Sequence, residues 1–114
     1  MVILNDILTI DKKIRYVVKI SLVGDFIESV SRNDDDFVVP EHKREKMARH
    51  ISLLAANHKI MDKFLGKSQM TITFRGEFAT ILIYTDEFLY SMSIDGADDV
   101  ESLGRKIFEL IKSI

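Results

Sequence analysis

Residues 70–94 read MTITFRGEFATILIYTDEFLYSMSI, and this stretch decides the fold. Apolar and polar residues alternate over its first six positions, which is typical of a half-buried strand. Gly76-Glu77 and Thr85-Asp86 supply turn residues, and two more strand-like runs follow at 78–84 and 88–94. The stretch therefore predicts three consecutive antiparallel strands joined by short turns.

The middle strand of the three is apolar on both faces. Phe78 and Leu82 lie on one face, and Ile81 and Ile83 lie on the other. A strand of this kind is covered on both sides. We therefore expect helices on both faces of the sheet.

A second strand pair precedes these three. Residues 15–23 are rich in β-branched and aromatic side chains, Gly24-Asp25 favours a turn, and residues 26–32 read as the returning strand. Before the pair, isoleucines at positions 3, 7, 10 and 14 have helical spacing. We expect a short helix over residues 2–13 and a hairpin after it.

A long helix is predicted from Pro40 to Leu65, with Gly66 as its C-cap. At 1.5 Å per residue it would be roughly 39 Å long. Its apolar residues form two sets that together cover an arc of roughly 220°, whereas one contact needs only about 100°. One set is Met47, Ile51, Leu54, Ala55, His58, Met61 and Leu65, and the other is Leu53, Ile60 and Phe64. We expect this helix to contact both its own sheet and a partner.

A last helix begins after Asp98 or Asp99, either of which is a suitable N-cap. Val100, Leu103 and Ile107 share one face of this helix. Gly104 interrupts it and predicts the close approach of another backbone. The element order is α-β-β-α-β-β-β-α, and the predicted fold class is α+β, with a five-stranded antiparallel sheet and helices on both faces.

Length and composition restrict the class of protein. We expect residues 1–114 to form one domain. The absence of cysteine excludes disulfides and thiolate chemistry and fits a reducing cytoplasm. The net charge of −2 predicts no strong attraction to nucleic acid. A signal peptide and a membrane span are not expected, because the N-terminus lacks a basic start and no apolar run approaches ~20 residues.

Few residues suggest site chemistry. Asp34, Asp35 and Asp36 are oxygen ligands, but their spacing does not fit an EF-hand, so we interpret them as a solvated loop. His42, His50 and His58 are eight residues apart, which does not match the i, i+4 spacing of metal-binding helices. Nothing in the sequence predicts an enzyme, a catalytic residue, a cofactor or a metal site.

The densest basic segment is residues 42–50, HKREKMARH. One alternative function is therefore a nucleic-acid-associated regulator that uses this helix, although we favour an ordinary solvated helix face. A second alternative is a small-molecule sensor with a ligand held between sheet and helix.

The order of elements, from about Asp6 to Ile111, resembles that of the roadblock / dynein-light-chain family within the profilin-like group. The hairpin at 17–30 is similar to the family's first two strands, residues 70–94 are similar to its three-strand meander, and the segment from Asp98 is similar to its last helix. The resemblance implies a non-enzymatic scaffold or regulator, often of small GTPases or dynein. It also implies dimerisation through the middle helix and the third strand.

We therefore predict a homodimer. The expected interface residues are Met47, Ile51, Leu54, Ala55, His58, Met70, Ile72 and Phe74. His58 decides the assignment, because its polar tip suits an interface better than a core. Leu53, Ile60 and Phe64 are then expected to face the sheet, with the reverse assignment as the alternative.

Overall fold

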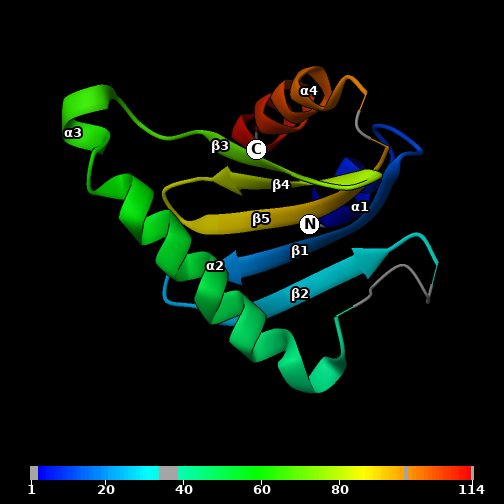
Figure 1. The fold of residues 1–114 in the computed structure, drawn as a ribbon, viewed down its shortest axis with the longest axis horizontal. Coiled ribbons are helices and arrows are strands. Elements are labelled where there is room, and N and C mark those ends of the chain that lie inside the picture. The colour runs from blue at the N-terminus through cyan, green and yellow to red at the C-terminus, as the bar shows by residue number, and fades with distance from the viewer. Residues whose placement is uncertain (1–2, 34–38, 97, 114) are drawn as a thin grey trace.

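In the computed structural model, residues 3–33, 39–96 and 98–113 are described. Five strands form one antiparallel sheet in the order β2-β1-β5-β4-β3. The strands are β1 (Ile14–Ser21), β2 (Phe26–Ser31), β3 (Met70–Arg75), β4 (Phe78–Tyr84) and β5 (Phe88–Asp95). The helices are α1 (Ile3–Leu8), the 3-10 turn η2 (Glu41–Lys43), α2 (Arg44–Lys59), α3 (Asp62–Leu65) and α4 (Val100–Lys112). Figure 1 shows α2 running obliquely across the sheet, with α3 at its far end.

The predicted fold class is confirmed. The three strands β3, β4 and β5 pair in sequence, with Ile72 opposite Ile81 and Ile81 opposite Met92. The hairpin β1–β2 joins this meander through β1, which pairs with β5 and sets Val17 opposite Met92. The middle of the sheet is therefore β5, and the doubly apolar strand β4 lies between β5 and the edge strand β3.

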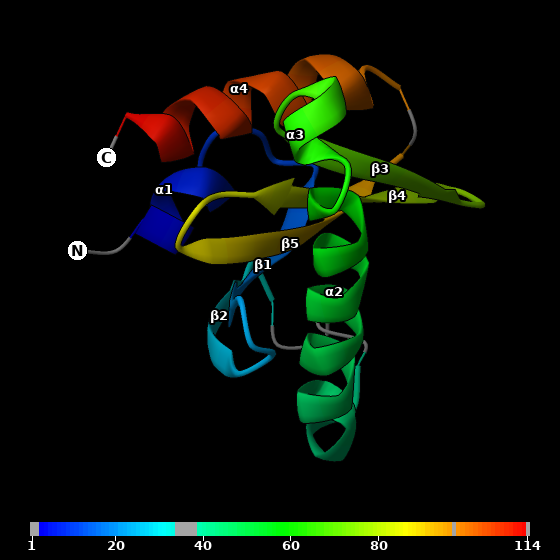
Figure 2. The same ribbon diagram turned by 90° about the vertical axis from the view of Figure 1, so that its left-hand side faces the viewer.

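The larger core lies between the sheet and the pair α1 and α4. Ile7 of α1 and Ile107 of α4 are fully buried there, against Ile81, Ile83 and Met92 of the sheet. These strand residues point to one face because side chains alternate along a strand. Figure 2 shows α1 and α4 on this side and α2 on the other.

The smaller core lies beneath α2. Ala48 and Ala55 of the helix are buried against Val18, Ile20 and Leu89 of the sheet. Small side chains on the helix allow it to lie close to the strands. This contact uses only a narrow face of α2, so much of the helix surface remains outside the core.

The middle helix is not continuous, and the predicted single helix from Pro40 to Leu65 is wrong. It begins as the turn η2 and is interrupted at Ile60 and Met61, before α3. The amide of Met61 donates to the carbonyl of His58, which is a tightened three-residue step. α3 projects beyond the sheet (Figure 1), where it has no sheet beneath it to align it with α2.

The first helix is also shorter than the predicted 2–13. It ends at Leu8, and Arg32 then holds the following segment. The guanidinium of Arg32 donates to the carbonyls of Leu8, Asp11 and Ile14 at 2.6, 3.1 and 3.0 Å. An arginine that directly follows β2 thus donates to carbonyls between the end of α1 and the start of β1, including that of Leu8, which the end of the helix leaves without an intrahelical partner.

Two expectations about α4 are corrected. Asp99 precedes the helix, but it has a left-handed φ of 57° and makes no capping hydrogen bond with its side chain. Gly104 meets side chains rather than a backbone: a Cβ there would lie 3.0 Å from the Sδ of Met70 and 3.6 Å from the Cδ1 of Ile81. The glycine therefore lets α4 approach β3 and β4 closely.

Candidate interaction surface

An open groove of about 520 Å³ runs between α2 and the face of β3 and β4. It exists because α2 packs mainly against β1 and β2, which lie toward the edge of the sheet opposite β3. The neighbouring face of β3 and β4 is left without a helix over it. We call this hollow the groove.

The wall of the groove is one flank of α2. Met47, Ile51, Leu54 and His58 line it, and these are four of the residues predicted for a dimer interface. Leu54 is 41% exposed, whereas Ile51 is 9% exposed and reaches into the core. The fifth predicted residue of this helix, Ala55, is buried beneath it at 2%.

The floor of the groove carries hydroxyl groups. Thr71 and Thr73 of β3 and Thr80 of β4 line it, and the hydroxyls of Thr71 and Tyr84 share a hydrogen bond. The Nε of Arg75 donates to the Oγ1 of Thr80 at 3.3 Å. The groove thus combines an apolar wall with a floor of polar groups that accept or donate hydrogen bonds.

Tyr84 joins the floor to the helix. Its ring centroid lies 5.7 Å from that of His58, at an angle of 34° between the planes. Burial raises the pKa of Tyr84, and its hydrogen bond with Thr71 acts in the opposite direction. His58 therefore packs on an aromatic ring at the groove, although its side chain remains exposed.

The three predicted interface residues of β3 lie on the other face of the sheet. Met70 and Ile72 pack against the larger core, and Phe74 is 64% exposed. Alternation along the strand separates them from Thr71 and Thr73, which line the groove. The predicted residues of α2 and β3 thus do not form one continuous surface, although β3 itself lies at an edge of the sheet.

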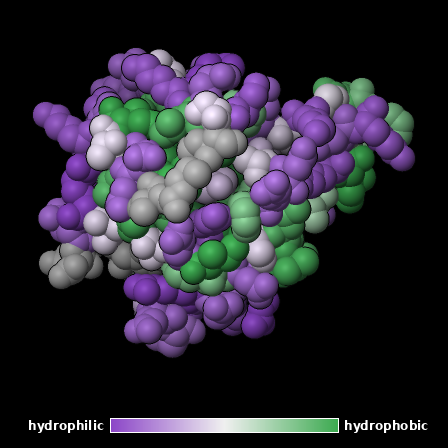
Figure 3. Space-filling model, turned by 180° about the vertical axis from the view of Figure 1, so that it is seen from behind, coloured by the Kyte–Doolittle hydropathy of each residue, from purple (hydrophilic) through white to green (hydrophobic). Residues whose placement is uncertain are grey.

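The assignment of Leu53, Ile60 and Phe64 to the sheet is wrong. Their side chains are 65%, 65% and 69% exposed, on the side of α2 and α3 away from the sheet. We call these three residues the outer stripe. The alternative assignment agrees better with the structure, because Ala48, Ile51 and Ala55 are the buried residues of α2. Figure 3 shows apolar surface on the projecting end of the molecule where α3 lies.

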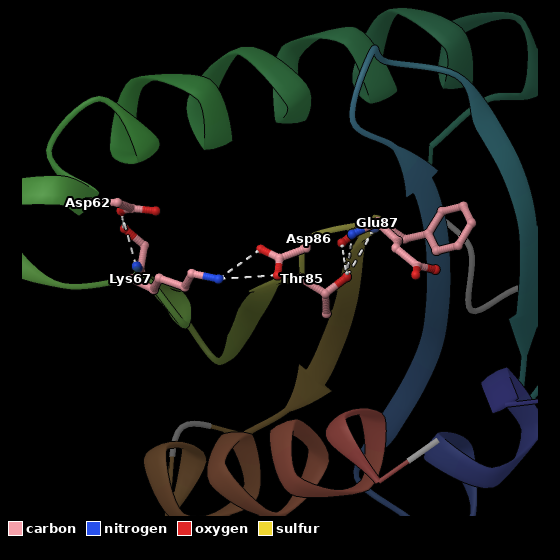
Figure 4. A network of polar contacts seen from close by, with 7 residues as sticks. Asp62, Lys67, Thr85, Asp86 and Glu87 are labelled. Atoms are coloured by element: carbon pink, nitrogen blue, oxygen red, sulfur yellow. Dashed lines mark hydrogen bonds and ion pairs between the residues drawn. The ribbon is translucent and has the colours of Figure 1, made fainter.

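A set of polar contacts ties the end of α3 to the turn between β4 and β5 (Figure 4). Asp62 accepts hydrogen bonds from the amide and the hydroxyl of Ser68, at 3.1 and 2.8 Å. Lys67 forms an ion pair with Asp86 at 3.2 Å. Thr85 closes the turn by accepting from the amide of Phe88 at 3.0 Å. These contacts connect the segment between α3 and β3 to the rest of the fold.

The remaining candidate features are metal ligands, a membrane span and the basic segment. Among the described residues, no group of three or more His, Cys, Asp or Glu residues is placed to hold a metal ion. Asp34, Asp35 and Asp36 lie outside the described residues. No described helix is both long and apolar enough to cross a bilayer. In the basic segment, Lys43, Lys46 and Arg49 are exposed.

Sequence comparison finds no matching family model and no matching curated protein. Comparison of folds gives clear matches. The roadblock/LC7 domain from Streptomyces avermitilis aligns with a TM-score of 0.71 and 13% identity, over 97% of this chain and 90% of that one. The gliding protein MglB from Thermus thermophilus aligns with a TM-score of 0.67 and 15% identity, over 97% and 84%. MglB in a tetrameric arrangement aligns with a TM-score of 0.69 and 16% identity, over 97% and 83%. This chain therefore has a roadblock-like fold.

Proposed function

We propose that this protein is a non-catalytic interaction module that forms a homodimer through α2 and the edge of β3. The observation that carries the proposal is the groove, on whose α2 wall the apolar side chain of Leu54 is 41% exposed and that of Met47 is partly exposed. Soluble monomers generally avoid large apolar patches. A second copy supplies what is missing, because its own α2 offers the same flank.

The proposed dimer has two-fold symmetry. In a two-fold interface the same patch of both subunits meets itself. β3 lies at the edge of the sheet beside the groove, and a sheet edge is a ready template for another strand. The fold supports the proposal, since MglB, which shares it, has been found in a tetrameric arrangement.

The sharpest test is Leu54→Glu, because Leu54 is a half-exposed residue of the wall. We expect the parent to have the mass of a dimer by light scattering and Leu54→Glu to have the mass of a monomer. Circular dichroism should show the same fold for both. Ile51→Glu and Ala55→Glu are unsuitable, because both residues are buried in the single chain.

Leu53→Glu is the matched control. It places the same charge one residue earlier, on the outer stripe, where the side chain is 65% exposed. This variant should remain dimeric. A parent that is monomeric at high concentration, or a Leu54→Glu variant that stays dimeric, would contradict the proposed dimer.

We further propose that the outer stripe binds a second protein. Its apolar residues lie within a basic segment: residues 41–65 contain six basic and three acidic residues, a net charge of +3, whereas the whole chain has −2. The basic residues are Lys43, Arg44, Lys46, Arg49, Lys59 and Lys63, and the acidic ones are Glu41, Glu45 and Asp62. This combination fits a partner with an apolar surface and an acidic rim. A small GTPase is the partner class that the resemblance to the roadblock family implies.

Small GTPases from the same genome, each loaded with GTP or GDP, are the probes for this partner. We expect one of them to bind the parent and Leu54→Glu more tightly than Leu53→Glu or Phe64→Glu. Binding to mixed DNA and RNA that falls steeply with salt, and that is lost in Lys46→Glu, would favour the nucleic-acid alternative instead.

The small-molecule alternative concerns the groove itself. Its volume of about 520 Å³ lies within the usual range for ligand sites. A monomeric parent that copurifies with a ligand in the groove would support this alternative over the dimer.

A further inference from the structure

The flank of α2 that lines the groove reads the same in both directions. Met47, His50, Leu54, His58 and Met61 occupy positions −7, −4, 0, +4 and +7 relative to Leu54. At 100° per residue the four that lie within α2 span an arc of about 80°, and Met61 follows at the step between α2 and α3. We call these five residues the ridge.

The ridge is accessible over its whole length. Leu54 and Met61 are 41% and 46% exposed, His50 and His58 are exposed, and Met47 is half-buried. The first four of these residues in sequence line the groove, and Met61 follows at the end of α2. The match does not arise from common residue types, because the chain has only three histidines and five methionines.

Residues beside the ridge do not follow the symmetric order. Ile51 and Asn57 are each three residues from Leu54, but Ile51 is 9% exposed and turns toward the sheet, whereas Asn57 is exposed. The symmetric order thus holds for the ridge and not for the residues beside it.

We infer that two copies of α2 pair antiparallel about a two-fold axis at Leu54, which sets Leu54 against its counterpart and His50 against His58 of the other copy. The inference rests on the proposed homodimer and specifies its register. A two-fold axis requires that if residue i meets residue j, then j meets i. A ridge with equal residues at equal distances from its centre meets this condition with like against like: methionine on methionine, histidine on histidine and leucine on leucine.

The register explains the choice of residues. Leucine and methionine fill an apolar contact, and methionine adapts to an irregular space at each end. Imidazole rings pack against each other and also offer hydrogen bonds. His58 already packs on Tyr84 within its own chain, so the histidine pair would continue a row of rings into the groove.

Cysteine trapping tests the register, because the chain has no cysteine of its own. A disulfide needs two Cα atoms within about 7 Å. Leu54→Cys should therefore cross-link to itself under mild oxidation. His50→Cys alone should not, since two copies of position 50 would be separated by eight residues along the axis, about 12 Å. His58→Cys alone should not either, for the same reason.

A mixture of His50→Cys and His58→Cys is the decisive sample. After exchange of subunits, the mixed dimer brings the two cysteines together, and we expect at least about tenfold more cross-linked product than in either variant alone, which corresponds to about 1.4 kcal/mol. Leu53→Cys, on the outer stripe, is the control and should give no more product than the single histidine variants.

Light scattering of the same proteins under reducing conditions separates the two proposals. A monomeric parent would overturn the proposed dimer itself. A dimeric parent in which the mixture gives no extra product, or in which Leu53→Cys cross-links better than Leu54→Cys, would leave the dimer standing and overturn the register.

Discussion

α4 and α2 are amphipathic helices on opposite faces of one sheet, and they use their apolar residues differently. In α4 the apolar residues Val100, Leu103, Ile107 and Ile111 are all buried against the sheet. In α2 the buried residues are Ala48, Ile51 and Ala55, whereas Leu53 and Leu54 remain exposed. Folding buries most of the apolar surface of α4, where Phe108 and Leu110 are partly buried, whereas much of the apolar surface of α2 stays exposed.

The difference teaches which residues serve stability and which serve association. A buried apolar side chain stabilises the fold by about 1.5–3 kcal/mol relative to the same side chain left exposed. Residues such as Ile60 and Phe64 contribute little of this in the single chain, since they are 65% and 69% exposed. Apolar-to-small substitutions should therefore lower the unfolding free energy when made in α4, whereas those at the exposed positions of α2 should affect association instead.

The largest effect is expected where β4 meets both layers. Ile83 is fully buried on the α4 side, and its neighbour Leu82 lines the groove on the α2 side. Ile83→Asp buries an unpaired carboxylate, which costs several kcal/mol of a total of about 5–15, so we expect loss of the fold. Leu82 is also buried, at 7% exposure, but it borders the groove, through which a carboxylate can reach water. Leu82→Asp should therefore melt at a lower temperature but still cooperatively. Thermal melts followed by circular dichroism measure both variants, and loss of the fold in both would contradict this difference.

A second pair compares the helices directly. Ile107→Ala in α4 should lower the unfolding free energy by about 2–5 kcal/mol, the usual cost of a large-to-small change in a core. Ile60→Ala at the end of α2 should change it by less than about 0.5 kcal/mol. Urea titration measures both, below the concentration at which the parent associates. Similar losses would mean that Ile60 is buried in solution.

The sheet could be predicted from the sequence because its signals are local. Alternation and turn residues placed β3, β4 and β5 with ends that differ from the structure by at most one residue. The ends of the helices were predicted less well, since they depend on distant contacts. Arg32 reaches back from the end of β2 to the end of α1, and no pattern within the helix predicts this.

The faces of α2 could not be predicted from apolarity alone. Leucine and isoleucine predict burial, yet the sheet is met chiefly by Ala48 and Ala55. A helix that packs closely needs small residues at the contact, and this requirement outweighed hydrophobicity. The signal was present as alanines at i and i+7, with Ile51 between them. His58 does line the groove. Because its polar tip was used to assign the whole flank to the interface, Ile51 and Ala55 were also assigned there, whereas both are buried in the single chain.

A third prediction concerns how tightly each helix packs. Gly104→Leu in α4 would force side-chain atoms against Met70 and Ile81, and should cost about 1–3 kcal/mol. Gly104→Ala should be near neutral, since about 1 kcal/mol of helix propensity offsets the displacement of the flexible end of Met70. Ala56→Leu is the control on the exposed side of α2 and should cost nothing measurable. Urea titration of the three variants would refute this tight packing if Gly104→Leu were as stable as the parent.

Alkaline pH gives a smaller comparison of the two layers. Burial raises the pKa of Tyr90, with Glu87 and Glu28 adding to it, and burial also raises the pKa of Tyr84 against its hydrogen bond with Thr71. Both folded-state pKa values thus lie above the ordinary value of 10.0. Their stabilising contribution is therefore present below the ordinary value and is lost as pH rises through the folded-state values.

Urea titrations at a series of alkaline pH values measure this loss. Tyr90→Phe should reduce the alkaline loss of stability more than Tyr84→Phe, because only Tyr84 has an opposing hydrogen bond. Both variants are to be compared with the parent at neutral pH, where tyrosine is protonated in either state. A steeper alkaline loss in Tyr90→Phe than in the parent would contradict the direction of the shift.

The smallest effects are expected at two ion pairs, one near each helix. Lys67 and Asp86 meet at 3.2 Å beyond α3, with side chains 76% and 80% exposed. Arg105 and Glu101 meet at 2.9 Å on α4, with side chains 66% and 71% exposed. Exposed pairs of this kind contribute little, because water screens them and the side chains lose freedom. Lys67→Ala and Arg105→Ala should each lower the unfolding free energy by less than about 0.5 kcal/mol, and added salt should reduce the difference further. If Lys67→Ala cost several times more than Arg105→Ala, the course of α3 would depend on this polar contact. Equal and small losses would mean that polar contacts do not distinguish the two helices. The difference between α2 and α4 would then lie in how much of their apolar surface is exposed, which on α2 is the surface of the groove wall and the outer stripe.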